Sequence, residues 1–257
     1  MIDIKSSKEI EIMQQSGSIL SLLMKKLINA AVDGTSEIEL DRMALDLIKE
    51  KGAEPGFKKV ENYKYGICVS LNDVCAHGIP TKSKLKEGDV LGIDAGVYFK
   101  GFHTDMSETI RVKSSDSKVK NKKDKIDKFI EVGKKALITG IKEAKIGNHI
   151  GHISKAIQDI VEVQNGYSVV RTLVGHGVGR NLHEKPEVPG YLKGNIHQTP
   201  VLKEGMTIAI EVIYNMGKPE LVLDKDGWSL KTKDASLSGL FERSIAVTKK
   251  GPLVLTP

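Results

Sequence analysis

Four acidic side chains and one histidine stand in sequence settings that favour metal binding. Asp94 and Glu211 each follow a short apolar run typical of a buried strand. Taken singly, either could be a strand-end carboxylate facing water. An ionised carboxylate at the edge of a core otherwise needs a partner, a metal ion or several hydrogen bonds. Asp105 follows eleven residues after Asp94, Glu242 precedes a third apolar run, and His176 lies between glycines that permit close approach. The five residues together could hold two metal ions that share ligands.

The residue types of this group indicate the chemistry. Oxygen ligands with one nitrogen and no sulfur favour Mn²⁺, Fe²⁺ or Co²⁺, with Zn²⁺ as a further choice. Two such ions about 3.5–4 Å apart can activate a water molecule and polarise a carbonyl group. Hydrolysis of an amide or ester is therefore expected. The glycine-rich segment around His176 lacks the spacing of a P-loop or a dinucleotide-binding fingerprint, so nucleotide binding is not expected.

Two pairs of helices, each followed by strands, are predicted to position these residues. Apolar side chains recur at helical spacing, and Ser36 with Glu39 forms a capping-box pattern at the start of the second helix. The expected helices are 10–31, 36–52, 126–144 and 150–166, and the expected strands of the first half are 65–69, 89–94 and 108–112.

A repeated motif indicates an internal duplication. Leu-Lys-Glu-Gly at 85–88 and the Ile-Asp pair ending at Asp94 reappear at 202–205 and at the Ile-Glu pair ending at Glu211, each 117 residues later. This predicts a single domain, residues 1–257, built from halves 8–112 and 125–250 about a pseudo-twofold axis. Asp94 and Glu211 should then occupy equivalent positions and converge where the halves meet.

Charge and composition narrow the class of protein. The net charge is 39 − 33 = +6, and segment 113–128 alone holds seven Lys and three Asp, a local 7 − 3 = +4. This segment is expected to be a solvated basic linker, with ribosome contact as a hypothesis. No apolar stretch is long enough to span a membrane, no signal peptide is evident, and the chain has only two cysteines. A cytoplasmic monomer is expected, with no membrane partner and no specific DNA.

The chain resembles the type I methionine aminopeptidases over nearly its whole length. The resemblance rests on segments 75–80, 93–105, 175–186, 210–211 and 227–242. Only 27 residues separate His183 from Glu211, which matches the short bacterial form of this family. The resemblance implies an α/β (α+β) pita-bread fold, with an antiparallel sheet core and outer helices. It also implies metal-dependent removal of the initiator methionine from nascent polypeptide N-termini when the second residue is small.

The resemblance further implies a role for each of the five residues. Asp94 and Asp105 would bind one divalent ion, while Asp105, His176 and Glu211 would bind the second. Glu242 would bridge the two ions beside Asp105. Glu211 would also accept a proton during hydrolysis.

Residues outside the ligand set would contact the substrate. By resemblance, His77 and His183 hydrogen-bond the scissile amide, and Tyr63, Cys68 and Trp228 join His77 in an apolar pocket for the methionine side chain. The sequence departs from common family residues at several pocket positions, namely Phe57, Val60, Ala76 and Leu182. A monovalent cation is a further implication, held at Asn72, Val74 and Ser238, although turn hydrogen bonds would also explain these residues.

Two other functions are alternatives. An X-Pro-type aminopeptidase shares the fold and ligand set, but such enzymes carry a whole domain before it, and only 76 residues precede His77 here. A non-catalytic pita-bread binding protein would have lost metal ligands, and all five are present in this chain.

Overall fold

Four α-helices form in the part of the chain that the computed structural model describes, residues 2–114 and 124–257. They are α1 (Ser7–Ala30), α2 (Glu37–Glu50), α3 (Lys125–Lys142) and α4 (Ile150–Gln158), the last continued by one π-helical turn at Asp159–Val163. The predicted capping box at the start of α2 is confirmed, because Ser36 and Glu39 hydrogen-bond each other's main chain and side chains. Short 3₁₀ turns lie at Phe57–Lys59 and Ile196–Gln198.

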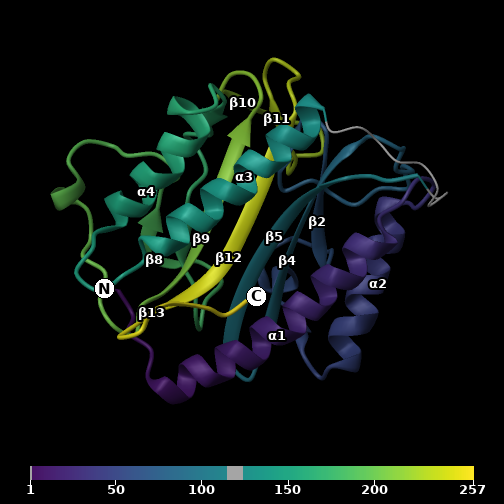
Figure 1. The fold of residues 1–257 in the computed structure, drawn as a ribbon. Helices are drawn as coiled ribbons and strands as arrows, with labels where there is room; N and C mark the ends of the chain where they lie inside the picture. The colour runs from purple at the N-terminus through teal and green to yellow at the C-terminus, as the bar shows by residue number, and fades with distance from the viewer. Residues whose placement is uncertain (1, 115–123) are drawn as a thin grey trace.

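A ten-stranded antiparallel sheet forms the centre of the molecule (Figure 1). Its main path runs in the order β1-β4-β5-β12-β9-β7-β8, with β2, β6 and β13 paired alongside. The strands of this path are β1 (Glu54–Pro55), β4 (Val90–Phe99), β5 (Phe102–Arg111), β12 (Ser238–Thr248), β9 (Thr207–Asn215), β7 (Gly175–Gly177) and β8 (Glu184–Val188). The others are β2 (Ile67–Leu71), β6 (Ser168–Val169) and β13 (Gly251–Val254), while β10 (Leu221–Leu223), β11 (Leu230–Thr232) and β3 (Val74–Ala76) form a small second sheet. The expected class, an antiparallel sheet with outer helices, is confirmed.

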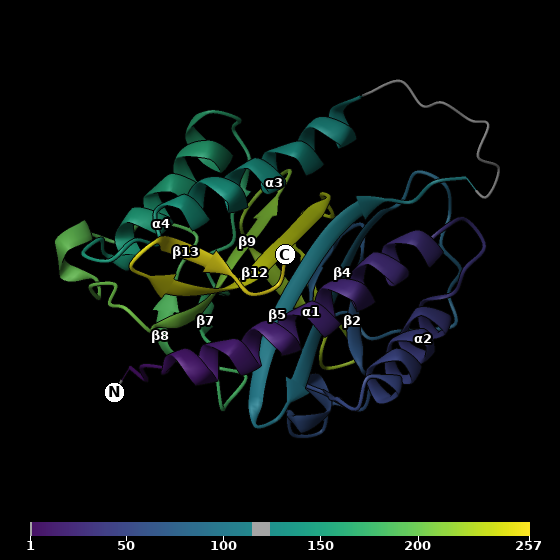
Figure 2. The ribbon, with the colours of Figure 1, turned by 60° about the horizontal axis from the view of Figure 1, so that its bottom comes forward.

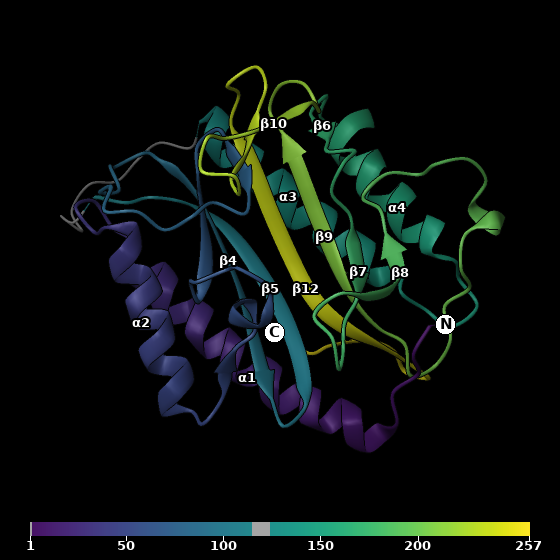
Figure 3. The same cartoon turned by 180° about the vertical axis from the view of Figure 1, so that it is seen from behind.

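The helices pack on one face of the large sheet, as Figures 1 and 3 show from opposite sides. One apolar core joins α1 and α2 to β2, β4 and β5, and a second joins α3 and α4 to β9 and β12. Alternate strand residues point to opposite faces. Ile93 and Ala95 of β4 and Ile210 and Val212 of β9 belong to these cores. The residues between them therefore face away from the helices.

Two strand predictions need correction. Asp94 and Glu211 lie inside β4 and β9 rather than at their ends, since these strands continue to Phe99 and Asn215. Strand β5 begins at Phe102 instead of residue 108. In β4 and β9 a single carboxylate interrupts a run that is apolar on both sides of it, and in β5 several polar residues precede residue 108. In each case the unbroken run of apolar letters is shorter than the strand.

Matched contacts in the two halves support the duplication hypothesis. The main-chain N–H of Gly34 donates to Leu85 at 2.9 Å, and that of Gly147 donates to Leu202 at 3.0 Å. Leu85 and Leu202 are the first residues of the repeated motif. The division into halves 8–112 and 125–250 stays a prediction.

Most of the basic segment 113–128 lies outside the described residues, because residues 115–123 are not among them. None of the described helices is long and apolar enough to cross a membrane.

Candidate metal centre

Three of the predicted carboxylates lie in one row across the sheet. Asp94 on β4 is opposite Ser107 on β5, Ser107 is opposite Glu242 on β12, and Glu242 is opposite Glu211 on β9. Residues directly opposite each other in antiparallel strands project from the same face. The three side chains therefore project from the face that the helices leave uncovered.

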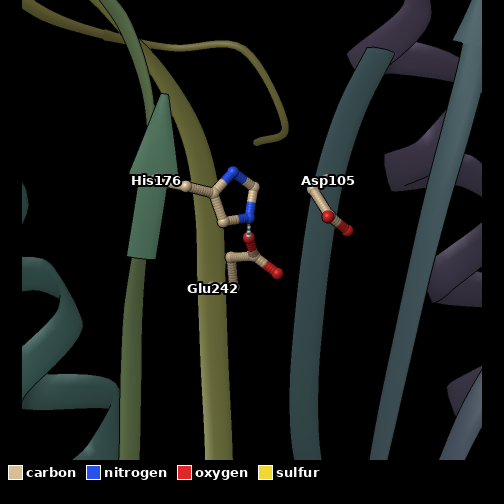
Figure 4. A group of neighbouring side chains, drawn as sticks. All are labelled: Asp105, His176 and Glu242. Atoms are coloured by element: carbon tan, nitrogen blue, oxygen red, sulfur yellow. Dashed lines mark ion pairs between the residues drawn. The ribbon is translucent and has the colours of Figure 1, made fainter. Parts of the chain in front are cut away.

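Asp105 and His176 project from the same face, because every second residue of a strand points to the same side of the sheet. Asp105 precedes Ser107 by two residues on β5, and His176 on β7 is opposite Ala209, two residues before Glu211. His176 Nε2 lies 3.3 Å from Glu211 Oε1 and 3.9 Å from Glu242 Oε1. Figure 4 shows the His176 ring and the Glu242 carboxylate facing each other, with Asp105 projecting from the neighbouring strand. One potential ligand atom from each of Asp105, His176 and Glu242 lies within 4.8 Å of the others.

The glycines beside His176 give its strand room to approach its neighbours. A Cβ atom on Gly175 would lie 2.5 Å from the Ala209 carbonyl oxygen, and one on Gly177 would lie 2.3 Å from the Lys185 carbonyl oxygen. Real Cβ atoms do not approach so closely. The prediction that the glycines beside His176 permit close approach of neighbouring strands is confirmed for Gly175 and Gly177.

The donor set suits a divalent cation. Asp105, Glu242 and His176 are 4%, 2% and 8% exposed, and buried oxygens of Asp94 and Glu242 have no hydrogen-bond partner among the described residues. Burial raises the pKa of the Asp94, Asp105 and Glu242 carboxyls, and the negative charges of neighbouring carboxylates raise it further. Burial opposes protonation of His176, but the hydrogen bond and charge of Glu211 outweigh it and raise its pKa. Bound cations would relieve this concentration of negative charge.

The raised pKa values predict how metal binding stabilises the protein as pH changes. A carboxyl whose folded pKa exceeds its unfolded pKa of about 4 stabilises the metal-free fold at low pH, and this contribution is lost as pH rises through the folded value. Mn²⁺ should therefore raise the melting temperature more at about pH 7.5 than at about pH 5.5, because it replaces the lost protons. Calorimetry of the metal-free protein with and without Mn²⁺ measures this. An equal increment at both pH values would contradict the prediction.

A cavity of about 150 Å³ adjoins the carboxylates. One wall is apolar, with Tyr63 in edge contact with Trp228 at 5.1 Å between ring centroids. Ser107 is a buried residue between Asp94 and Glu242 that the sequence prediction did not include. Its spacing of two from Asp105 could have placed it on the same face of the strand. The cavity-lining residues include all the predicted pocket residues and three of the four departures: Phe57, Val60, Tyr63, Cys68, His77, Asp94, Asp105, His176, Leu182, His183, Glu211, Trp228 and Glu242.

The two non-ligand histidines enter this cavity from different elements. His77 follows β3 with φ = 57°, a left-handed conformation that is uncommon for a residue with a side chain and that often marks functional sites. His183 lies on the loop between β7 and β8, with its ring centroid 4.4 Å from that of His176. Partial desolvation and the adjacent His176 lower the pKa of His183. A neutral His183 can donate or accept a hydrogen bond at neutral pH.

A second cavity, of about 460 Å³, shares five lining residues with the first, namely His77, His183 and the proposed ligands Asp94, His176 and Glu211, and it is also lined by Ala76. The fourth departure, Ala76, thus borders the site from this side rather than from the apolar pocket.

The residues predicted for a monovalent cation already hydrogen-bond to protein groups. The Asn72 side chain bonds Asp89 and the Val90 main chain, and the Ser238 hydroxyl bonds Tyr214 and Asn215. The monovalent site stays a prediction.

Comparisons with known proteins agree with this geometry. The model of metallopeptidase family M24 matches residues 11–249. Methionine aminopeptidases from Borreliella burgdorferi and Bacillus subtilis are each 40% identical, over 98% and 100% of this chain and 97% and 99% of theirs. The crystal structure of a methionine aminopeptidase from Thermotoga maritima has a TM-score of 0.92 and 35% identity, covering 100% of this chain and 99% of that one. A prolidase from Pyrococcus furiosus shares the fold, with a TM-score of 0.77 at 23% identity, and this chain covers 65% of it.

The family match agrees with the geometry of the site, in which carboxylates and the buried His176 project from the sheet face that the helices leave uncovered. The chain belongs to metallopeptidase family M24, and its fold is the pita-bread fold of that family.

Proposed function

We propose that this protein removes the N-terminal methionine from peptides and nascent proteins whose second residue is small. The observation that carries the proposal is a cluster of four carboxylates and His176 bordering an apolar cavity, in which Asp105, His176 and Glu242 are buried and Asp94 and Glu211 are partly buried. A buried anionic group can bind the metal ions of a peptidase, and the adjoining apolar cavity suits an unbranched apolar side chain. The named relatives, similar over their full lengths, support this activity.

Two divalent ions, Co²⁺, Mn²⁺, Fe²⁺ or Zn²⁺, are proposed as cofactors. Such ions supply an activated water and polarise the scissile carbonyl group. The residues that would hold them are Asp94, Asp105, His176, Glu211 and Glu242. The raised pKa values of the Asp94, Asp105 and Glu242 carboxyls mean that metal loading would release protons.

The protein's own groups orient the substrate and move protons. Glu211 is proposed to accept a proton as the tetrahedral intermediate forms, because its carboxylate borders both the cavity and His176. His77 and His183 line the same cavity and are proposed to hydrogen-bond the scissile amide and help protonate the leaving amine. Tyr63, Cys68 and Trp228 surround the methionine side chain.

The role of His183 predicts that His183→Ala separates catalysis from metal binding. We expect kcat/KM for a Met-Ala-Ser peptide to fall by about 10²-fold or more, because a group that positions and protonates the amide is lost. Metal affinity, measured by calorimetry, should stay close to that of the wild type, since His183 is not a proposed ligand. Loss of metal binding in His183→Ala would contradict this division.

The proposed activity is tested with matched tripeptides. Met-Ala-Ser should release free methionine, whereas Met-Lys-Ser should be cleaved much more slowly, because His77 and His183, which line the cavity, are proposed to crowd a large second side chain. An X-Pro-type aminopeptidase would instead prefer a peptide with proline second. Preferential cleavage of Ala-Pro-Ser would favour that alternative.

Further aspects of the proposal concern the protein's surroundings. Cys68 and Cys75 are buried and unpaired, which agrees with the reducing cytoplasm where N-terminal methionine excision and protein maturation take place. We also propose a monomer whose basic segment 113–128 makes weak, salt-sensitive ribosome contacts.

A further inference from the structure

The loop between β7 and β8, residues 178–183, lines the cavity on one side and contacts the start of the chain on the other. Leu182 and His183 line the apolar cavity. The start of the chain is bound to the same region at two points: Glu184, the first residue of β8, pairs with Lys5, and Arg180 in the loop pairs with Glu9 in the first turn of α1. Figure 2 shows this N-terminal segment passing close to β7 and β8 before α1 begins. The start of the chain thus contacts the outer side of a loop whose inner side faces the site.

Lys5 is unusually buried for a lysine. Its side chain is 1% exposed, and its ammonium group pairs with Glu184 and lies 3.1 Å from Asp3. Its main-chain N–H donates to the Gly205 carbonyl oxygen at 2.8 Å, which fixes the segment from the other side. Lysine is almost never fully buried unless it is paired, because an unpaired ammonium loses its hydration. The Lys5–Glu184 pair is therefore a specific contact of the fold rather than a surface ion pair.

Gly179 is the third glycine of the motif around His176, and its contact with Lys5 explains why a larger residue would not fit there. A Cβ atom on Gly179 would lie 2.3 Å from Lys5 Cε, 2.5 Å from Lys5 Nζ and 2.9 Å from Glu184 Oε1. The Lys5 side chain occupies the space that any larger residue would need. Neither the metal ligands nor the apolar pocket requires this glycine.

The pair also fixes the turn that leads to His183. Glu184 Oε1 accepts the main-chain N–H of Asn181 at 3.0 Å, and Gly179 accepts the main-chain N–H of His103 at 2.7 Å. Glu184 thus joins Lys5 on one side to the loop backbone on the other, directly beside His183.

We propose that Lys5 is a positioning residue that holds the loop of His183 against the metal centre through its buried ion pair with Glu184. This inference rests on the proposed peptidase function for its activity readout. A catalytic group displaced by about 1 Å can lose a factor of about 10² in rate, so a contact that fixes the loop affects turnover without touching substrate.

The test compares Lys5→Met with variants that change the same contact differently. Lys5→Met, Glu184→Gln and Gly179→Ala should each lower kcat for Met-Ala-Ser by about tenfold or more, as loss of a supporting contact typically does. Glu9→Gln is the matched control, because it removes the other pair to this loop, in which the Arg180 side chain is 56% exposed. Its kcat should stay within about twofold of the wild type.

A double-mutant cycle separates positioning from general stability. If Lys5 acts through His183, adding Lys5→Met to His183→Ala should change kcat by less than about twofold, whereas independent effects would multiply. An equal loss in both backgrounds, or wild-type activity in Lys5→Met, would overturn the proposal.

A second readout does not depend on activity. In the metal-free protein, the imidazole ¹⁵N signals of His183, assigned by their loss in His183→Ala, should shift or broaden in Lys5→Met and Glu184→Gln but not in Glu9→Gln. Unchanged His183 signals in both pair variants would overturn the proposal. If the wild type did not cleave Met-Ala-Ser, the proposed function would fail while these signals still decided the role of Lys5.

Discussion

Glu211→Gln and Asp105→Ala are each expected to lower kcat/KM for Met-Ala-Ser by at least about 10³-fold, which corresponds to about 4 kcal/mol of transition-state stabilisation. Asp105 is buried between β4 and β12 beside the other carboxylates, so its removal deletes an oxygen ligand from the centre of the group. Glu211→Gln keeps the size of the side chain but removes a negative charge next to His176. Both changes weaken metal binding, and the second also removes the proposed proton acceptor.

The control for these two variants is an acidic residue far from the site. Asp159→Asn removes a surface ion pair with Lys155 on the same helical stretch and should leave kcat/KM unchanged. Steady-state kinetics at saturating metal, together with the metal content of each purified variant, measure the effect. If Asp105→Ala retained activity within about tenfold of the wild type, the proposed ligand set would be wrong.

The second large effect concerns the first residue of the substrate. Peptides that begin with Lys or Gly are expected to be cleaved at least about 10²-fold more slowly than Met-Ala-Ser. The cavity beside the carboxylates is lined by Phe57, Tyr63, Cys68 and Trp228. A lysine ammonium group there would lose its hydration without a partner, and glycine would leave the cavity unfilled.

Norleucine is the matched probe for this selectivity. It keeps the length of methionine and replaces sulfur with a methylene group, so a norleucine peptide should be cleaved at a reduced but measurable rate, since such changes are worth only about 1–3 kcal/mol. Competition between peptides in one reaction, followed by mass spectrometry, gives the ratios of kcat/KM directly. Equal cleavage of Leu-, Lys- and Met-initiated peptides would identify a general aminopeptidase instead.

Local sequence signals were sufficient where a short-range contact determines the structure. The Ser36–Glu39 capping box is an example, because its two residues are three apart. The glycines around His176 were interpreted correctly for another reason: only glycine permits such close approach, although the atoms approached, such as those of Ala209 and Lys5, are distant in sequence. The position of Asp94 and Glu211 on apolar strands was also visible in the sequence. Their place within the strands was not, because buried polar residues interrupt the apolar pattern there.

Other features depend on contacts between distant parts of the chain. The row that joins Asp94 to Glu211 needs the strand order β4-β5-β12-β9, and nothing in the local pattern gives that order. The same holds for Lys5 and Glu184, which are 179 residues apart and each look like ordinary surface residues in the sequence. The segment that supplies Phe57 and Tyr63 has no regular periodicity, so its folding over the cavity could be expected only through the family resemblance.

The central claim is that the cluster of four carboxylates and His176 binds metal ions that the peptidase reaction requires. The most direct measurement is the release of free methionine from Met-Ala-Ser by chelator-treated protein, before and after Co²⁺ or Mn²⁺ is restored. The account predicts that chelation abolishes release, that added metal restores it in the wild type, and that added metal does not restore it in Asp105→Ala. Methionine release that is unchanged by complete removal of metal would contradict the account.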